Sequence, residues 1–208
     1  MGIRVSQGLS LDGRQVSNWQ EMEAAYRRRI QTHGLGHESL FYPDEALHIA
    51  KLAHMSRVLY NEVKTGESVL DVGCGTGDLI PFLPPCHYRG IDLVSEFVAE
   101  AARRYPDLTF ENMNLLNIDE QYDWVLLAGM MGSVPEPEIL LQKAWGLAAR
   151  GIIVDFIDSS KYHGYLNSYS LGACTEFLLR QGAQQVRIYP TPKHNWTFFV
   201  VCHQSLWL

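Results

Sequence analysis

The stretch SVLDVGCGTGDL, residues Ser68 to Leu79, places three glycines within five positions directly after an apolar run. This order is typical of a buried strand that enters a nucleotide-binding loop, because glycine lets the backbone approach a ligand closely. The spacing, Gly73-x-Gly75-x-Gly77, is one residue shorter than the GxGxxG pattern of pyrophosphate-binding loops. Asp71 precedes the loop, where a carboxylate would repel a pyrophosphate. The stretch therefore favours a nucleoside that carries an amino acid and presents an ammonium group.

Outward from this loop, short apolar runs alternate with helix-prone segments. Strands are expected within residues 67–73, 88–92, 108–114, 122–129 and 151–157, followed by a hairpin within residues 183–190 and 195–202. Helices are expected within residues 77–84, 95–105, 135–148 and 170–182. This order predicts an α/β fold with a seven-stranded, mostly parallel sheet, an antiparallel last strand and helices on both faces.

The first 64 residues precede this pattern and are predicted to form a helical extension, or lid. Helices are expected over residues 18–30 and 44–63, whereas residues 1–17 are polar and are expected to be loosely structured. In the second helix the spacing of three or four predicts a single apolar face, made of Ile49, Leu52, Met55, Leu59 and Val63. Residues 65–208 are expected to form one globular unit.

Composition narrows the class of protein. The net charge of −6 disfavours a protein that tracks nucleic-acid phosphates. The longest apolar run is too short to cross a membrane, so no membrane partner is expected. The four cysteines are scattered, without the spacing of a zinc site or a disulfide framework, which favours a cytoplasmic protein without a metal.

Polar or small residues end the next strands, where open α/β sheets bind ligands. Asp92 ends the second strand, and its carboxylate suits the two hydroxyls of a ribose in either NAD or S-adenosylmethionine. Asn114 ends the third strand, where its side-chain carbonyl suits an adenine amino group, although asparagine is also common at strand ends. The fourth strand ends in the small residues and methionines of LLAGMMGS, which leave room beside a ligand.

These motifs resemble those of the class I S-adenosylmethionine-dependent methyltransferases. VLDVGCGTGDL is similar to the first motif of that family, YRGIDL to its second, LTFENMNLL to its third and YDWVLLAG to its fourth. The resemblance implies S-adenosylmethionine as cofactor and S-adenosylhomocysteine as product. The implied cofactor-binding residues are Asp71, Gly73, Cys74, Gly75, Thr76, Gly77, Asp92, Leu93, Asn114, Leu115, Ala128, Gly129 and Met130. The sequence departs from the family at Asn114, where aspartate is common.

The acceptor of the methyl group is less clearly indicated. The fourth motif lacks the (D/N)PP(Y/F) pattern of the adenine and glutamine N-methylating members, and the aromatic residues Tyr42, Tyr162 and Tyr165 suit a small planar acceptor. We therefore predict a small-molecule substrate. His163 is the first candidate for a base, with Tyr162 and Asp158 as its neighbours, and His194, His37 or Tyr42 are the alternatives.

Two other functions remain open at this stage, and an RNA or protein acceptor is a further option for the methyltransferase. The aspartate at the end of the second strand also suits an NAD(P)-dependent oxidoreductase, although the glycine spacing and the terminal hairpin weigh against it. A catalytically silent S-adenosylmethionine-binding protein is consistent with the lack of an evident base and with Asn114. The sequence indicates neither the oligomeric state nor the acceptor.

Overall fold

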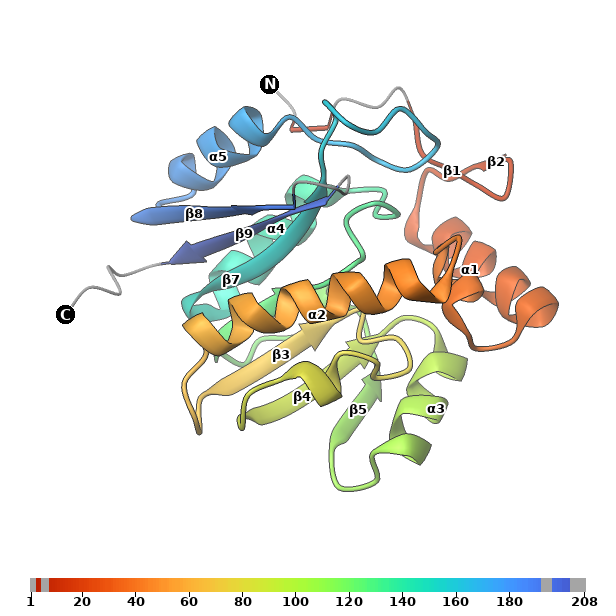
Figure 1. The fold of residues 1–208 in the computed structure, drawn as a ribbon, viewed down its shortest axis with the longest axis horizontal. Coiled ribbons are helices and arrows are strands. Elements are labelled where there is room, and N and C mark those ends of the chain that lie inside the picture. Colours follow the sequence, from red (N-terminus) through yellow and green to blue (C-terminus); the bar gives the residue numbers. More distant parts are fainter. Residues whose placement is uncertain (1–2, 5–7, 192–195, 203–208) are drawn as a thin grey trace.

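The computed structural model describes residues 3–4, 8–191 and 196–202, the last five of them as backbone only. A seven-stranded sheet has the order β5-β4-β3-β6-β7-β9-β8 (Figure 1). Its strands are β3 (Ser68–Val72), β4 (His87–Asp92), β5 (Thr109–Asn112), β6 (Tyr122–Leu127), β7 (Ala148–Ile157), β8 (Gln185–Pro190) and β9 (Trp196–Cys202). The strands from β5 to β7 pair in parallel, and β9 runs antiparallel to both of its neighbours. The predicted sheet with its antiparallel last strand is confirmed.

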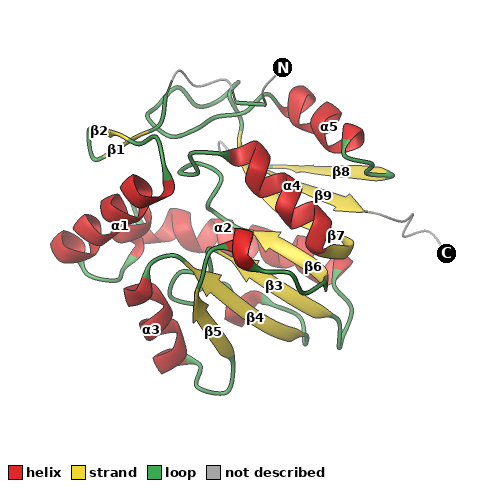
Figure 2. Cartoon of the chain, turned by 180° about the vertical axis from the view of Figure 1, so that it is seen from behind, coloured by secondary structure: helices red, strands yellow, loops and turns green. Residues whose placement is uncertain are grey.

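Helices cover both faces of the sheet. One face carries α2 (Glu45–Glu62), which crosses in front of β3 in Figure 1. The other face carries α4 (Pro137–Leu147), seen in front of the sheet in Figure 2, and α5 (Leu171–Arg180). Two further helices complete the chain, α3 (Ser95–Arg104) beside β5 and α1 (Trp19–His33) in the N-terminal extension.

The apolar runs of the central strands serve both faces at once. In β6, Val125 and Leu127 belong to the core beneath α4 and α5, whereas Trp124 and Leu126 belong to the core beneath α2. Successive side chains of a strand point to opposite faces, so a strand covered on both sides is apolar without alternation. This burial explains why the strands are evident in the sequence.

The glycine loop does not lead into a regular α-helix. Only a turn of 3-10 helix, η2 (Ile80–Phe82), follows it, where the sequence predicted a short helix within residues 77–84. Prolines at positions 81, 84 and 85 explain the difference, because proline has no N–H to donate to a helix. A similar turn, η3 (Leu115–Asn117), follows β5.

The N-terminal segment is more ordered than predicted. Residues Ser10–Leu11 (β1) and Arg14–Gln15 (β2) form a small hairpin. Leu9, Leu11 and Val16 are buried in a third core together with Met22 of α1. The sequence did not indicate this packing because most residues of the segment are polar. Its few apolar residues are the ones that are buried.

The buried face of α2 also differs from the prediction. Met55 and Leu59 are buried as expected, but Ile49 is 48% exposed. Lys51 and Glu62 lie on the buried face instead, where each has a partner of opposite charge. Ion pairing thus allows charged residues at positions that a pattern of apolar spacing leaves out.

Within the described part of the chain, the helices are too short or too polar to cross a membrane.

Candidate cofactor and acceptor site

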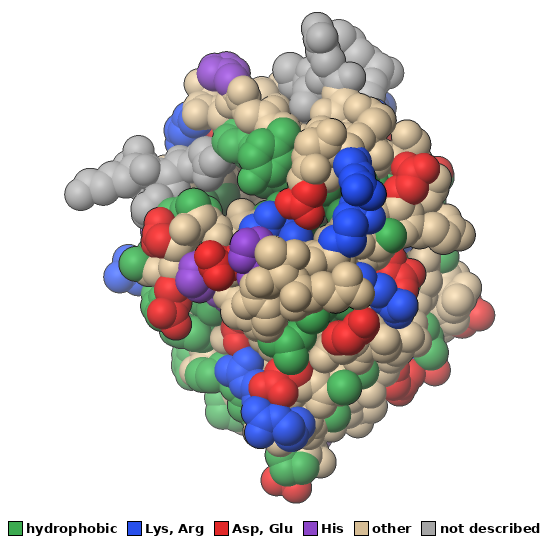
Figure 3. Space-filling model, turned by 90° about the vertical axis from the view of Figure 1, so that its right-hand side faces the viewer, with side chains coloured by type: hydrophobic (Ala, Val, Ile, Leu, Met, Phe, Trp, Pro, Cys, Tyr) green, Lys and Arg blue, Asp and Glu red, His purple; other side chains and the backbone are tan. Residues whose placement is uncertain are grey.

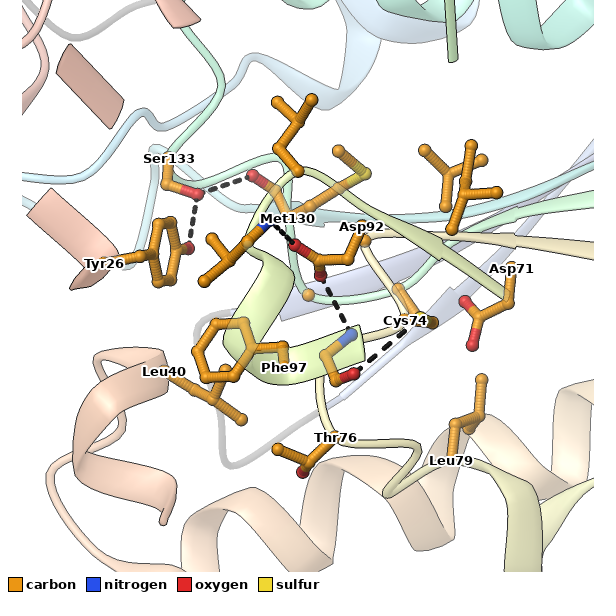
Figure 4. Close-up of a pocket in the computed structure, with 18 of the residues that line it drawn as sticks. Tyr26, Leu40, Asp71, Cys74, Thr76, Leu79, Asp92, Phe97, Met130 and Ser133 are labelled. Carbon is orange, nitrogen blue, oxygen red and sulfur yellow. Dashed lines mark hydrogen bonds between the residues drawn. The ribbon is translucent and has the colours of Figure 1, made fainter. Parts of the chain in front are cut away.

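A cavity opens at the carboxyl ends of β3, β4 and β6 and is closed on one side by the N-terminal extension (Figure 4). It encloses about 1080 Å³, including open solvent at its mouth. All but one of the predicted cofactor-binding residues line it, in the order Asp71, Gly73, Cys74, Gly75, Thr76, Asp92, Leu93, Asn114, Leu115, Ala128, Gly129 and Met130. The structure therefore brings these residues together around one cavity, which makes it the candidate cofactor site.

Asp71 is a buried carboxylate with an unused acceptor. Its Oδ2 accepts a hydrogen bond of 2.9 Å from the Tyr88 hydroxyl, while its Oδ1 is buried without a partner in the described structure. Burial raises the pKa of Asp71 to about 7, opposed by the Tyr88 hydrogen bond and assisted by the charge of Asp92. A buried carboxylate oxygen without a donor is costly, so the position suits a ligand that brings a cationic donor.

Asp92 supports the glycine loop and faces the cavity. Its Oδ2 accepts the Gly75 N–H at 2.9 Å and its Oδ1 accepts the Val94 N–H at 2.8 Å (Figure 4). Burial raises the pKa of Asp92 to about 6, although these backbone donors lower it. Because each oxygen keeps a second lone pair, the carboxylate is still able to accept bonds from the hydroxyls of a ligand.

Gly77 lies outside the cavity. It has φ +79°, and a Cβ at this position would approach Ile80 Cδ1 and Tyr105 Cε2 to 3.0 Å each. This glycine therefore serves the turn and its packing, whereas Gly73 and Gly75 line the cavity.

The side chain of Asn114 is held by its own turn. Its Oδ1 accepts the Leu116 N–H at 2.9 Å and so caps η3. The predicted contact between this oxygen and an adenine amino group therefore has to use its second lone pair. The position of Asn114 at the cavity is thus compatible both with a contact to adenine and with a purely structural role at the end of the strand.

The N-terminal extension forms one wall of the cavity. The Tyr26 hydroxyl of α1 lies 2.8 Å from Ser133 Oγ, which donates to the carbonyl of Met130 at 3.1 Å (Figure 4). Leu40 lies at the end of η1 (His37–Leu40) and lines the cavity as well. These contacts connect the extension to the end of β6.

A second cavity lies beside the first and shares part of its wall. Tyr42, Tyr162 and Tyr165, the three predicted acceptor contacts, all line it. Six aromatic residues contribute to its lining, and Tyr42 and Lys51 line both cavities. The cavity behind the glycine loop thus adjoins a second cavity with aromatic side chains in its lining.

Comparison with known proteins agrees with this geometry. Residues 69–151 match the family described as a methyltransferase domain. The match covers less than half of the chain, and solved methyltransferase structures share the fold of most of it.

Three methyltransferases are similar to this chain in sequence or in fold. A probable (S)-tetrahydroprotoberberine N-methyltransferase 2 of Papaver bracteatum is 25% identical over 152 residues, which cover 66% of this chain and 41% of the relative. The magnesium protoporphyrin IX methyltransferase of Synechocystis PCC 6803, solved with bound SAM, superposes with a TM-score of 0.69 at 17% identity, covering 88% of this chain and 97% of that one. The 1,6-didemethyltoxoflavin-N1-methyltransferase of Burkholderia thailandensis superposes with a TM-score of 0.62 at 18% identity, covering 89% of each chain. This chain spans less than half the length of the Papaver relative.

Of the candidate bases among the described residues, Tyr42 lines both cavities and the candidate histidines line neither. His163 is exposed and lines neither cavity, and His37 lines neither. Asp158 is buried and accepts bonds from the Ser160 backbone and hydroxyl. His194 lies outside the described residues. The assignment of His163 stays a prediction that its position does not support.

The sequence analysis did not predict an ion pair that lies in the wall shared by the two cavities. Lys51 Nζ of α2 lies 2.8 Å from Asp155 Oδ2 of β7, and each side chain is 6% exposed. An aspartate inside the apolar run GIIVDFI and a lysine four residues before Met55 are signals that could have located the pair.

Among the residues that the structure describes, no group of three histidines, cysteines or acids is placed to hold a metal ion.

Proposed function

We propose that this chain is an S-adenosylmethionine-dependent methyltransferase that acts on a small-molecule acceptor. The observation that carries the proposal is the unpartnered, buried Oδ1 of Asp71 at the cavity behind the glycine loop. Such an oxygen suits the ammonium of the cofactor's methionine group and would repel the pyrophosphate of NAD.

Different residues of the cavity would hold different parts of the cofactor. Asp71 would hold the ammonium of the cofactor, Asp92 the ribose, and the backbone from Gly73 to Gly75 the chain between them. Ala128, Gly129 and Met130 would lie beside the sulfonium group. The bound cofactor supplies an activated methyl group, so the main tasks of the chain are to align the acceptor and to exclude water.

The second cavity supports a small acceptor. The aromatic residues in its lining suit a planar ring. By their names, the enzymes reported above act on small molecules. Basic and acidic side chains are interspersed on the face shown in Figure 3, which does not favour a nucleic-acid partner. We also place the protein in the cytoplasm, since Cys74, Cys86 and Cys174 are free thiols.

Calorimetric titration with S-adenosylhomocysteine and with NAD and NADP tests the cofactor. We expect S-adenosylhomocysteine to bind, with severe weakening in Asp71→Ala and in Asp92→Ala while circular dichroism stays unchanged. Binding of NAD(P) without binding of S-adenosylhomocysteine would refute the proposal.

Transfer of a labelled methyl group from S-adenosylmethionine to a panel of planar amines, phenols and carboxylic acids tests turnover. Binding of the cofactor without transfer to any of them would favour the catalytically silent alternative.

A further inference from the structure

Two hydrogen-bond donors, the Tyr42 hydroxyl and the Lys51 ammonium, lie in the wall that the two cavities share. A Cβ added to Gly129 would lie 3.3 Å from the Tyr42 hydroxyl and 2.7 Å from Lys51 Nζ. The two donors therefore lie against the backbone at the end of β6, where the cofactor cavity meets the acceptor cavity.

The carboxylate of Asp155 holds this group in place. Its Oδ2 accepts from Lys51 at 2.8 Å and its Oδ1 accepts from the Gly129 N–H. Each oxygen already has a partner, and Asp155 is the only acid among the described residues that line the second cavity. Although burial opposes the charge of Lys51, the neighbouring Asp155 raises its pKa, so the side chain remains an ammonium at neutral pH.

The direction of the hydrogen bond between Lys51 and Tyr42 follows from their chemistry. An ammonium has no acceptor, so the Tyr42 oxygen must accept over the 2.9 Å that separates them. The hydrogen of the Tyr42 hydroxyl then has no acceptor among the described residues. Burial raises the pKa of Tyr42, so the phenol stays protonated and acts as a donor instead of a base.

The other two hydroxyls that line both cavities, those of Tyr26 and Ser133, already have hydrogen-bond partners within the chain. Tyr26 and Ser133 bond to each other, and Ser133 donates to the Met130 carbonyl. The Tyr162 hydroxyl also only accepts, from the Leu166 N–H at 3.2 Å, but it lines the second cavity alone and not the shared wall. Tyr42 and Lys51 therefore distinguish the shared wall by presenting donors where the two ligands would meet.

We propose that Tyr42, polarised by Lys51, selects acceptors that carry an oxygen with free lone pairs, as in a carboxylate, phenolate or carbonyl, beside the methylated atom. The inference rests on the proposed function. An acceptor with a donor or an apolar group at this position leaves the Tyr42 hydrogen unpaired, which a desolvated site penalises.

Three naphthalene probes of matched shape test the inference on the full chain loaded with S-adenosylhomocysteine. They are 2-naphthoate, 2-naphthylmethylamine and 2-methylnaphthalene, and their affinities are measured by calorimetry. We expect 2-naphthoate to bind about tenfold more tightly than the other two. Tyr42→Phe, also loaded with S-adenosylhomocysteine, is expected to remove this preference.

Tyr60→Phe is the matched control. Tyr60 lies on α2, the helix that carries Lys51; it is 58% exposed and donates to the Leu83 carbonyl, outside both cavities. Retention of the preference in Tyr60→Phe and its loss in Tyr42→Phe support the inference. Equal binding of the three probes to the wild type, no binding of any, or a preference that survives Tyr42→Phe would each overturn it. Failure of S-adenosylhomocysteine to bind the wild type would instead refute the proposed function.

Discussion

At the residue scale, Asp71 is the position where folding and ligand binding conflict. It is 1% exposed, one of its oxygens has no partner in the described structure, and burial raises its pKa to about 7. Burying an unpaired carboxylate destabilises the ligand-free chain. A residue kept in such surroundings is explained by a ligand that supplies the missing partner.

The free energy of unfolding of the ligand-free chain should depend on pH because the Asp71 carboxylate is buried. The pKa of Asp71 is higher in the folded chain, about 7, than its ordinary value of 3.8. The stability it contributes is therefore fully present below pH 4 and is lost as the pH rises to about 7. Replacement by asparagine removes this loss, so the stability of Asp71→Asn relative to wild type should increase by on the order of 2–4 kcal/mol between pH 4 and pH 8. Urea unfolding at both pH values measures the change, and a relative stability independent of pH would contradict it.

The affinity for the cofactor product should depend on pH in the opposite sense. Only the ionised Asp71 carboxylate pairs with an ammonium, so we expect S-adenosylhomocysteine to bind more tightly as the pH rises from 6 to 8. Asp92, with a pKa raised to about 6, Tyr88 and Cys74 are the neighbouring titratable groups. Calorimetry across this range measures the trend.

Asp71→Asn is the control for that trend, since it keeps an oxygen for the Tyr88 hydroxyl but cannot ionise. It should bind weakly, with little dependence on pH above 7. A variant that retains the full pH dependence would exclude Asp71 as its source.

The sequence predicted these residues unequally. Asp71 and Asp92 were evident because each lies at the carboxyl end of a predicted strand, and the parallel topology brings the strand ends together. Lys51 and Asp155 were not, because their partnership joins residues that lie 104 positions apart in the chain (155 minus 51). A pairing of that kind depends on where α2 crosses the sheet, which no local pattern specifies.

At the scale of elements, the turn after β3 depends on Gly77. A Cβ here would combine a left-handed backbone with contacts of 3.0 Å to Ile80 and Tyr105. We expect Gly77→Ala to lower the free energy of unfolding by about 2–4 kcal/mol, the sum of backbone strain and overpacking. Urea unfolding gives the value.

Gly66→Ala provides the matched comparison. Gly66 also has a positive φ, +84°, but a Cβ there meets nothing within 4 Å. It should therefore cost only the backbone strain, about 1–2 kcal/mol. Equal losses in the two variants would show that crowding at Gly77 is unimportant.

The helices show where sequence patterns were sufficient and where they failed. α1 and α2 appear close to their predicted bounds, with Asn18 and Asp44 as their N-caps. The expected helix after the glycine loop is reduced to η2, since apolar residues there promote burial but the prolines prevent a regular helix. Apolar periodicity thus located the helices, and local backbone chemistry decided their lengths.

At the scale of the whole molecule, the N-terminal extension completes the site that the sheet begins. Trp19, Met22 and Tyr26 of α1 and Lys51 and Met55 of α2 line the same cavity as the glycine loop. The extension also has its own small core, shared with Leu93 and Leu166 of the sheet domain. The predicted division at residue 64 therefore separates segments that depend on each other for the site.

This arrangement predicts that a bound cofactor stabilises the extension as well as the sheet. A ligand held between Asp71 and the wall formed by α1 and α2 would have to be released before these helices separate from the sheet, which raises the cost of local opening. Hydrogen exchange measured with saturating S-adenosylhomocysteine should therefore slow in residues 19–26 and 40–55 as well as in residues 71–77. Residues 185–190 of β8, outside both cavities, serve as the internal control and should not change. Protection confined to residues 71–77 would show that the extension does not close over the cofactor. The extension would then serve as a lid over the acceptor cavity alone.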